Sequence, residues 1–323
     1  MAEAGGLIGA GSAQFGLGFA GDSGSRLATC LILGNFDGVH LGHQAILRAA
    51  RSEADRLGVA LTAVTFEPHP RTVIEPALDF RLLSTFDLRR RLLAEGGVDR
   101  LWVIPFDLRL MAMTPEFFME RLQERLQIRV MVVGPGFSIG KGGQGRLDFL
   151  TSYATEAGFS LKVVEQLAWR GVPISSSQVR SQLAKGDLGA VQEMLGRPLQ
   201  VLGKVVHGAG LGKRLGFPTA NIQFATNQAL PQDGVYAMEL TTEQGQQLAA
   251  VGSIGTRPHF DGAQRAFEVH CLEAPGDLYG QLALVGVHRF LRSQAAFASD
   301  QALIEQMVQD ASAAASFLSS LTS

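Results

Sequence analysis

The chain has 323 residues, 46% hydrophobic and 18% charged, with a formal net charge of -2 at pH 7. That length suits one large domain or two ordinary ones, and the composition excludes a disordered or fibrous chain. The near-balance of charge gives no electrostatic reason to expect a nucleic-acid partner.

Cysteine and membrane signals narrow the setting of the protein. Cys30 and Cys271 lie far apart in the sequence, so we expect no disulfide framework and a reducing, cytoplasmic location. No apolar run is long enough to span a bilayer, so no membrane partner is expected. Residues 1–26 are rich in Gly, Ala and Ser without the pattern of a signal peptide, and we expect them to form a flexible tail.

Residues 27–184 alternate between two kinds of segment. Short apolar runs predict buried strands at 28–33, 60–66, 100–106, 129–134 and 161–167. Segments with helical spacing lie between them, at 43–57, 86–97, 114–126 and 146–158. Buried strands alternating with amphipathic helices predict an α/β domain with a parallel sheet, in which ligands bind beyond the carboxyl ends of the strands.

The pattern changes after residue 184. Residues 185–199 predict a short helix and a linker, with Gly196 and Pro198 marking its end. Residues 200–323 contain closely spaced apolar runs at 201–206, 234–240, 247–254, 266–273 and 281–287, and a final helical segment at 299–318. Short strands at this spacing must pair or close to protect their edges, so we expect an antiparallel β-barrel with a terminal helix.

The stretch GNFDGVHLGH, residues 34–43, follows the first predicted strand. It places His40 and His43 one turn apart at the start of a helix, where they share a face. A helix N-terminus attracts phosphate, and two imidazoles there can donate hydrogen bonds to a triphosphate and to the charge that develops in nucleotidyl transfer. Surface histidines and a metal-binding pair are the alternatives, and no third metal ligand follows at a suitable spacing.

Two further stretches lie at the same predicted edge of the sheet. ISSSQVR, residues 174–180, begins a helix that one of its serines can cap, and Arg180 is a candidate to meet a departing pyrophosphate. TFEPHPR, residues 65–71, ends the second strand, and its prolines fix a rigid loop. His69 in that loop is equally a candidate surface residue and a candidate functional one.

The second domain begins with GKVVHGAGLGKRLGFPTANI, residues 203–222. Its glycines permit close approach of a backbone to phosphates, although a flexible hairpin would look the same. It is not a P-loop, because GLGK is followed by Arg214 rather than by Ser or Thr. Thr219 and Asn221 lie two apart on one side of an extended segment and offer hard oxygens that suit Mg²⁺ bridging nucleotide phosphates.

Glu268 supplies a carboxylate to the second domain. It lies in the apolar run FEVH, where a charged side chain is costly without a partner or a task. Such a carboxylate can take a proton from a substrate hydroxyl. The alternative is an outward-facing strand residue with no part in catalysis.

Seven stretches, taken together and in order, give the chain a family resemblance. Between residues 28 and 310 they are GNFDGVHLGH, TFEPHPR, ISSSQVR, GFPTANI, IGTRPHF, FEVH and GDLYG. The chain resembles the bifunctional riboflavin kinase/FAD synthetases of bacteria. The resemblance implies a Rossmann-like nucleotidyltransferase domain of the HxGH class, which adenylylates FMN, over 27–184. It also implies a riboflavin-kinase β-barrel over 200–323.

The implied reactions use ATP twice, to phosphorylate riboflavin to FMN and to convert FMN to FAD with release of pyrophosphate. By position, His40, His43, Ser176 and Arg180 would hold the ATP triphosphate for adenylyl transfer, and the backbone at Gly34 and Asn35 would line that site. In the kinase, Glu268 would be the base, while Thr219 and Asn221 would bind Mg²⁺ and ATP. Further contacts to the ATP of the kinase would come from Gly203, Lys204, His207, Gly208, Gly210 and Gly216.

Five positions depart from the family pattern. Gly136 stands where the family usually carries Asp or Asn, in a loop implied in nucleotidyl transfer. Ser253 stands for an Asn, His259 for a Thr and Gln294 for a Glu, on the flavin-facing side of the kinase. Ser177 stands for a Thr and keeps the hydroxyl.

Three alternatives compete with the two-step enzyme. The first is a riboflavin kinase whose N-terminal domain binds nucleotide without turnover, because Gly136 lacks a polar side chain. The second is a flavin-binding or regulatory protein, which would not need to retain both a base and a phosphate clamp. The third is a different adenylyltransferase, acting on pantetheine phosphate or nicotinamide mononucleotide, which leaves GFPTANI unexplained. The sequence leaves the oligomeric state open.

Overall fold

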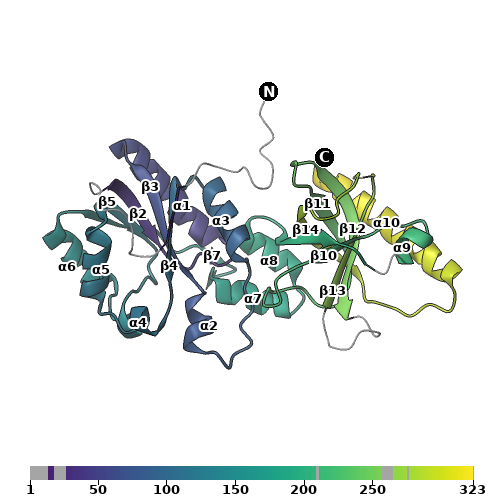
Figure 1. Ribbon diagram of the computed structural model, residues 1–323, viewed down its shortest axis with the longest axis horizontal. Helices are drawn as coiled ribbons and strands as arrows, with labels where there is room; N and C mark the ends of the chain where they lie inside the picture. The colour runs from purple at the N-terminus through teal and green to yellow at the C-terminus, as the bar shows by residue number, and fades with distance from the viewer. Residues whose placement is uncertain (1–13, 18–26, 209–210, 257–264, 275, 323) are drawn as a thin grey trace. The chain divides into compact units, whose positions relative to one another are not determined.

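A computed structural model describes residues 14–17, 27–208, 211–256, 265–274 and 276–322. The chain divides into two compact units, shown in Figure 1. Of the described residues, the α/β unit holds those up to 82 and 86–176, and the barrel unit holds 83–85 and 177–322. The division falls after residue 176, whereas the sequence pattern predicts that the first domain ends at residue 184.

A six-stranded parallel sheet forms the centre of the α/β unit. Its strands, in the order β1-β4-β3-β2-β5-β6, are β1 (Gln14–Leu17), β4 (Arg100–Pro105), β3 (Ala60–Glu67), β2 (Leu27–Leu33), β5 (Leu126–Val133) and β6 (Ser160–Val163). The helices are α1 (Leu41–Leu57), α2 (Pro70–Ile74), α3 (Phe86–Glu95), α4 (Leu108–Met111), α5 (Pro115–Gln123) and α6 (Leu147–Ala157), with a short 3-10 helix η1 (Lys141–Gly143). Strands β2 to β6 and the helices between them confirm the predicted α/β architecture.

The packing on both faces of the sheet explains why strand β2 is almost continuously apolar. Leu31 of β2 belongs to a buried cluster that includes Phe118 of α5 and Leu150 of α6. Cys30, which points to the other face because side chains alternate along a strand, donates its thiol to the backbone carbonyl of Ala50 in α1 (3.3 Å). Helices therefore bury both faces of β2, which removes the alternation of polar and apolar residues that a half-exposed strand would show.

Between β2 and β5, the order in which the chain adds strands to the sheet switches from one side to the other (Figure 1). The chain runs from β2 through β3 to β4 on one side and then returns to β5 on the other. In open α/β sheets, a crevice for ligands lies beyond the carboxyl ends of the strands at such a switch point. The segments that leave the sheet there are residues 34–43 after β2 and the loop that begins at Gly134 after β5.

Two segments of the α/β unit differ from the expectation. Gln14–Leu17 falls within the segment 1–26 that was expected to form a flexible tail, yet it forms β1 and pairs in parallel with β4. The edge of a sheet exposes backbone N–H and C=O groups, so a short extended segment can pair there without an apolar pattern of its own. Strand β6 ends at Val163 rather than at 167, and the chain then forms the small hairpin of β7 (Ala168–Trp169) and β8 (Val172–Pro173).

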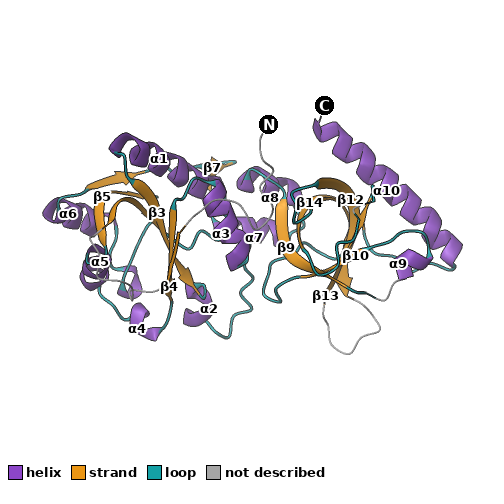
Figure 2. Cartoon of the chain, turned by 45° about the horizontal axis from the view of Figure 1, so that its top comes forward, coloured by secondary structure: helices purple, strands orange, loops and turns teal. Residues whose placement is uncertain are grey.

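The barrel unit contains a closed barrel of antiparallel strands, which confirms the predicted barrel (Figure 2). Around the barrel the strands are β10 (Ala220–Gln223), β13 (Arg265–Cys271), β12 (Gln247–Thr256), β11 (Gly234–Thr241), β14 (Leu282–Arg292) and β9 (Leu199–Val206). The helices are α7 (Ser176–Ala184), α8 (Leu188–Leu195), α9 (Leu211–Arg214) and the expected terminal helix α10 (Asp300–Thr322). Ala314 of α10 packs against Val235, Ala237 and Val251 on the outside of the barrel.

Candidate active sites

The loop after β2 is folded tightly back on itself. Phe36 and Val39 have left-handed backbone conformations, with φ of 50° and 39°, and both side chains are buried. The ring of Phe36 lies against Gly34, where a Cβ atom would be 3.4 Å from it, an ordinary contact. The N–H of Gly34 donates to the carbonyl of Val64 in β3 (3.1 Å). Non-glycine residues hold left-handed conformations only where their surroundings enforce them, so packing sets the shape of this loop.

His40 and His43 lie together at the start of α1, where the sequence analysis placed them. His40 is the N-cap, and its Nδ1 accepts a hydrogen bond from the backbone N–H of His43 (3.4 Å). The two rings stack, with centroids 3.7 Å apart and an interplanar angle of 19°. A Cβ atom at Gly42 would lie 3.1 Å from the His40 ring, which explains the glycine in HLGH. Because Nδ1 of His40 is an acceptor, its neutral ring carries the proton on Nε2.

His43 is held in its neutral form. Burial, followed by the electrostatic cost of placing a second positive charge beside the His40 ring, lowers the pKa of His43 well below its ordinary value of 6.5. Its Nδ1 is buried and has no hydrogen-bond partner among the described residues. The ring of Phe36 meets the His43 ring edge-on, with centroids 5.3 Å apart. A neutral imidazole offers one N–H donor without a positive charge, so His43 can orient a phosphate oxygen but does not neutralise it.

Ser176 ties the start of α7 to the same loop. Its Oγ donates to the backbone carbonyl of Asp37 (2.8 Å), a residue whose side chain is buried. The helix begins at Ser176, as ISSSQVR predicts. Arg180 lies one turn further along, in the part of α7 that belongs to the barrel unit, and its contact with pyrophosphate stays a prediction.

Gly136 lies in the loop after β5, at the switch point. A Cβ atom there would meet nothing within 4 Å, and the backbone is not left-handed. Packing therefore does not exclude the Asp or Asn that the family usually carries at this position. Other glycines of the loop are constrained, since a Cβ atom at Gly140 would lie 2.6 Å from the backbone nitrogen of Pro115.

Two residues near this edge were missed or left open by the sequence. Arg89 of α3 is almost completely buried and donates to the carbonyl of Asn35 (3.1 Å), a residue expected to line the nucleotide site. His69 is buried and its Nδ1 caps α2 by accepting from the N–H of Arg71 (3.2 Å), while its ring stacks on Phe80. The contacts of His69 are structural, and those of Arg89 connect helix α3 to the candidate site.

A row of polar side chains crosses three strands of the barrel. Asn221 of β10 pairs with Glu268 of β13, and Glu268 pairs with Ser253 of β12. Residues directly opposite one another on neighbouring strands share a face of the sheet. Phe267 and Val269, on either side of Glu268, are buried, while Glu268 itself is partly exposed. The row therefore lies on the outer face of the barrel, where a substrate can reach it.

The glycine-rich segment lies directly against this row. A Cβ atom at Gly208 would lie 2.2 Å from Nδ2 of Asn221, and one at Gly212 would lie 3.3 Å from Oγ1 of Thr219 and 2.3 Å from the carbonyl of Phe217. The approach of Gly212 to a backbone carbonyl requires glycine, whereas a side chain at Gly208 would require the amide of Asn221 to move. The segment thus packs on the two residues that we expect to bind Mg²⁺ and ATP.

The remaining residues expected at the ATP site of the kinase have different surroundings. Gly203 lies against the carbonyl of Gln223 in the neighbouring strand, where a Cβ atom would come within 2.5 Å, so its first role is to close the barrel. Lys204 is exposed, Gly216 has a left-handed φ of 86°, and Gly210 lies outside the described residues.

His207 stacks on Tyr279 of the GDLYG turn, with ring centroids 3.8 Å apart. The backbone N–H of Gly280, the next residue, donates to the carbonyl of Val205 (2.9 Å), which fastens this turn to strand β9. The ring of Tyr279 is 48% exposed. The motif GDLYG contributes to the family resemblance but assigns no role to Tyr279, although an exposed aromatic side chain beside a glycine-rich segment is itself a signal for a binding surface.

Two of the departures from the family pattern lie on β12 or against it. Ser253 stands in the row with Glu268. Nε2 of Gln294 donates to the carbonyl of Ile254 (3.4 Å), and a Cβ atom at Gly255 would lie 2.3 Å from that nitrogen. Gln294 therefore lies across the backbone next to Ser253, while His259 falls outside the described residues.

Comparison with known proteins assigns a class to each part of the chain. The profile of the FAD synthetase family matches residues 24–178, and that of the riboflavin kinase family matches residues 195–318. The chain therefore joins a nucleotidyltransferase domain to a riboflavin kinase domain.

Curated relatives extend over most of the chain. The bifunctional riboflavin kinase/FMN adenylyltransferase of Escherichia coli strain K12 is 36% identical over 281 residues, which cover 87% of this chain and 90% of that protein. Its counterpart in Pseudomonas fluorescens is 38% identical over 286 residues, with coverage of 87% and 90%. The chain belongs to the bifunctional riboflavin kinase/FMN adenylyltransferase family.

A solved structure shows the same fold. The crystal structure of a protein from Streptococcus pneumoniae described as a macrolide-efflux protein aligns with a TM-score of 0.80 and 27% identity, over 90% of this chain and 94% of that one. Within the described part of our chain, none of the helices has both the length and the apolar character needed to cross a membrane.

Proposed function

We propose that the chain catalyses two successive reactions of flavin cofactor synthesis. The barrel unit transfers the γ-phosphoryl group of ATP to the terminal hydroxyl of riboflavin, giving FMN and ADP. The α/β unit transfers the AMP moiety of a second ATP to the phosphate of FMN, giving FAD and pyrophosphate. The observation that carries this proposal is that one chain holds both a stacked His40–His43 pair at a helix N-terminus and the Asn221–Glu268 pair on a barrel.

In the kinase step, Glu268 acts as the general base. Its carboxylate takes the proton of the riboflavin hydroxyl while the hydroxyl oxygen forms a bond to the γ-phosphorus and the bond from that phosphorus to the ADP oxygen breaks. Its place beside Asn221 on the outer face supports this role, because it brings the base next to a residue that would hold the phosphates. The backbone of the segment around Gly208 lies against Asn221 and can approach the phosphates closely.

Mg²⁺ fits the donors on this face of the barrel. Thr219 offers a hydroxyl oxygen and Asn221 an amide oxygen, which are the hard donors this ion prefers. The contacts of Gly212 with Thr219 and of Gly208 with Asn221 bring a backbone that can hold phosphates to the same donors. When bound, the ion would be held by Thr219 and Asn221 and would neutralise charge on the transferred phosphoryl group.

In the adenylyl step, positioning and hydrogen bonding carry the reaction. An oxygen of the FMN phosphate forms a bond to the α-phosphorus of ATP, and the bond to pyrophosphate breaks. The free N–H groups at the start of α1 and the helix dipole favour the negative triphosphate there. Neutral His43 donates one hydrogen bond without competing for a proton, and His40, Ser176 and Arg180 are the further residues that we assign to the triphosphate.

The alternative is a chain that only phosphorylates riboflavin and whose α/β unit binds nucleotide without turnover. The observation in its favour is Gly136, which leaves open space at the switch point where the family usually carries a carboxylate or amide. Gly34 and Asn35, which we assign to the nucleotide site, are retained in both cases, so nucleotide binding alone does not separate the two.

A time course separates them. The purified chain is incubated with riboflavin, ATP and Mg²⁺, and the flavins are separated by chromatography. FMN that appears first and then declines as FAD forms supports two working sites. FMN that accumulates without FAD supports the kinase alone, and no FMN contradicts both.

Two substitutions then assign the steps to the units. We expect His43→Ala to abolish FAD formation from FMN and to leave FMN formation unchanged. Glu268→Gln keeps the shape of the side chain but removes the base, so FMN formation should fall while FAD formation from supplied FMN persists. Equal loss of both activities in either variant would contradict the assignment to two sites.

We place this enzyme in the cytoplasm, with riboflavin, FMN, FAD and ATP as its partners. The support is the state of its thiols, since Cys30 and Cys271 are free and buried, as befits a reducing compartment. Burial raises the pKa of the Cys30 thiol to about 12 and that of Cys271 to about 11, so both stay protonated and unreactive.

A further inference from the structure

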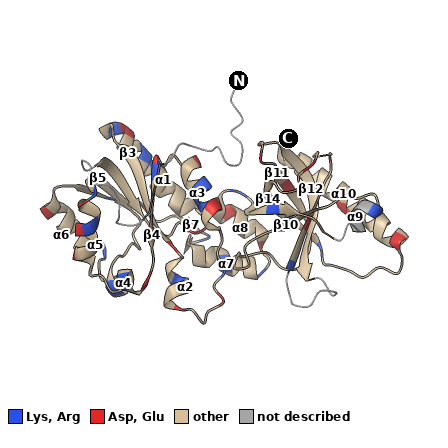
Figure 3. Ribbon diagram, in the orientation of Figure 1, with Lys and Arg blue, Asp and Glu red and all other residues tan. Residues whose placement is uncertain are grey.

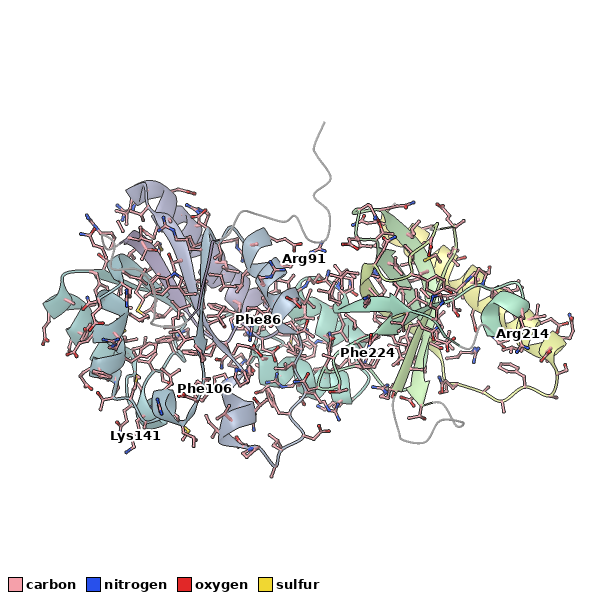
Figure 4. The ribbon with its side chains drawn as sticks, in the orientation of Figure 1. Phe86, Arg91, Phe106, Lys141, Arg214 and Phe224 are labelled. Carbon is pink, nitrogen blue, oxygen red and sulfur yellow. The ribbon has the colours of Figure 1, made fainter. Side chains whose placement is uncertain are left out.

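Arg89 is a buried cation at the nucleotide edge of the α/β sheet, and the reactions above give it no task. It lies on α3, and its side chain is 1% exposed. Taking a charge out of water is costly unless partners compensate for it, and a guanidinium has five N–H donors to satisfy. Figure 4 labels two neighbours on the same helix, Phe86 and Arg91. The ring of Phe86 lies under the Arg89 guanidinium, 5.5 Å from its centroid to Cζ.

The partners of Arg89 come from the carboxyl ends of two adjacent strands. Nη1 donates to the backbone carbonyl of Asn35, two residues beyond the end of β2 (3.1 Å). Nη2 donates to the carbonyl of Phe66 in β3 (3.3 Å) and pairs with the carboxylate of Glu67, the last residue of that strand. Nε is buried and has no partner among the described residues. One guanidinium thus joins the ends of β2 and β3 at the edge where the ligand binds.

The contact with Asn35 reaches the histidine pair in two steps. Asn35 is followed by Phe36, whose left-handed φ of 50° must be held by its surroundings. The Phe36 ring lies over Gly34 on one side and meets the His43 ring on the other, with centroids 5.3 Å apart. A shift of the Asn35 carbonyl would therefore move the ring that supports His43.

We propose that Arg89 is a positioning residue for ATP in adenylyl transfer, an inference that rests on the proposed function of the α/β unit. It fixes the Asn35 carbonyl against the end of β3, and so sets the place of Phe36 and His43 before ATP arrives. A planar guanidinium suits this task because its fork reaches three acceptors in fixed directions, whereas a lysine ammonium is a single point. Arg89 acts through these residues and does not itself touch ATP.

The test compares Arg89→Met and Arg89→Lys with the unchanged chain. FAD formation from FMN gives KM for ATP and kcat, and equilibrium binding of ATP is measured by calorimetry, with the barrel site as internal standard. Arg91→Met is the matched control: it removes a guanidinium from the same helix, and that guanidinium pairs with Glu95 one turn along α3. Riboflavin phosphorylation in each preparation reports that the barrel unit is folded and gives the amount of active chain.

We expect Arg89→Met to raise KM for ATP in FAD formation by about 10- to 100-fold, the cost of displacing a site by about 1 Å. The ATP affinity of the α/β unit should fall to the same extent in Arg89→Met, while its rate of riboflavin phosphorylation stays the same. Arg91→Met should leave KM for ATP, ATP affinity and riboflavin phosphorylation unchanged. Arg89→Lys should recover part of the loss.

Unchanged KM and ATP affinity in both Arg89 variants would overturn the inference, even if kcat fell through loss of folded enzyme. If Arg89→Met does not fold, the same comparison is made with Arg89→Lys, and an unchanged KM and ATP affinity there would overturn it. If the unchanged chain makes no FAD, the proposed function fails, and the calorimetric comparison still decides the role of Arg89 in binding ATP.

Discussion

Replacing Gly208 with alanine should disable the kinase and spare adenylyl transfer. The added Cβ would lie 2.2 Å from Nδ2, 2.5 Å from Cγ and 2.6 Å from Oδ1 of Asn221. Carbon atoms in contact are about 3.5–4.0 Å apart, so Asn221 or the glycine segment must move by about 1 Å. A displacement of that size at a site of chemistry can cost about 100-fold in rate. We therefore expect kcat/KM for riboflavin phosphorylation to fall by about that factor.

Initial rates of FMN formation measure the effect of Gly208→Ala, and FAD formation from supplied FMN in the same preparation reports on the other site. Gly286→Ala is the matched control on β14 of the same barrel, because its Cβ would lie 3.6 Å from the nearest atoms, an ordinary contact. Gly208 is exposed, so thermal unfolding should change little. A Gly208→Ala variant that keeps most of its kinase activity would refute the close packing of the segment on Asn221.

Three further predictions test other features. The pKa of His43 is lower in the folded chain than its unfolded value of about 6.5, so the folded state loses stability as the pH falls below 6.5 and the unfolded chain takes up a proton at His43. The free energy of unfolding in urea should therefore fall between pH 7.5 and pH 5, and it should fall less in His43→Gln. Gly136→Asn should fold as stably as the unchanged chain and raise the rate of FAD formation several-fold, and a loss of thermal stability would show that the space is closed. Asp310→Asn weakens the ion pair between buried Asp310 of α10 and Arg292 of β14 (2.7 Å), and it should lower the free energy of unfolding by about 2 kcal/mol. Glu305→Gln, on the exposed side of α10, is the control and should cost less than about 0.5 kcal/mol. Equal effects of the two substitutions would contradict a stabilising role for the ion pair.

The hydrophobic pattern of the sequence predicted most of the secondary-structure elements, and there is a physical reason for each strand that it missed. Strands β2 and β3 were predictable because both of their faces are buried over most of their length, which leaves continuous apolar runs. Strand β6 is mostly exposed, and its apolar run predicted a strand that extends beyond its observed end at Val163. Strand β10 was not predicted as a strand, because ANIQ is short and has mixed polarity. It pairs with β9 and β13 through its backbone, and that pairing is decided by the closure of the barrel rather than by its own side chains.

Spacing alone located the histidine pair but not its geometry. The separation of His40 and His43 predicts a shared face, yet it does not reveal that Nδ1 of His40 is used as the helix cap or that the rings stack. Those features depend on Gly42, since a side chain there would crowd the His40 ring. The glycine was visible in the motif, but its reason needed the conformation of the loop.

Arg89 could have been found from the sequence with a closer look at α3. The helix carries three consecutive arginines, and only Arg89 falls on the stripe of Leu88, Leu92 and Leu93, which are buried. A charged residue on a buried helical face needs compensating partners, so periodicity alone marks it for attention. Its partners, however, come from 54 and 22 residues earlier in the chain, and spacing within a helix says nothing about them.

The glycines near the two sites act in opposite ways, and this bears on Gly136. Gly42 makes room for the His40 ring, while Gly208 lets a backbone lie against the Asn221 side chain, so a methyl group at either of them displaces a neighbour. Gly136 does neither, because the space around it is open. The missing polar side chain is therefore a chemical change without a packing reason. Any deficit that it causes in adenylyl transfer should then be reversible by one substitution, without compensating changes elsewhere in the loop.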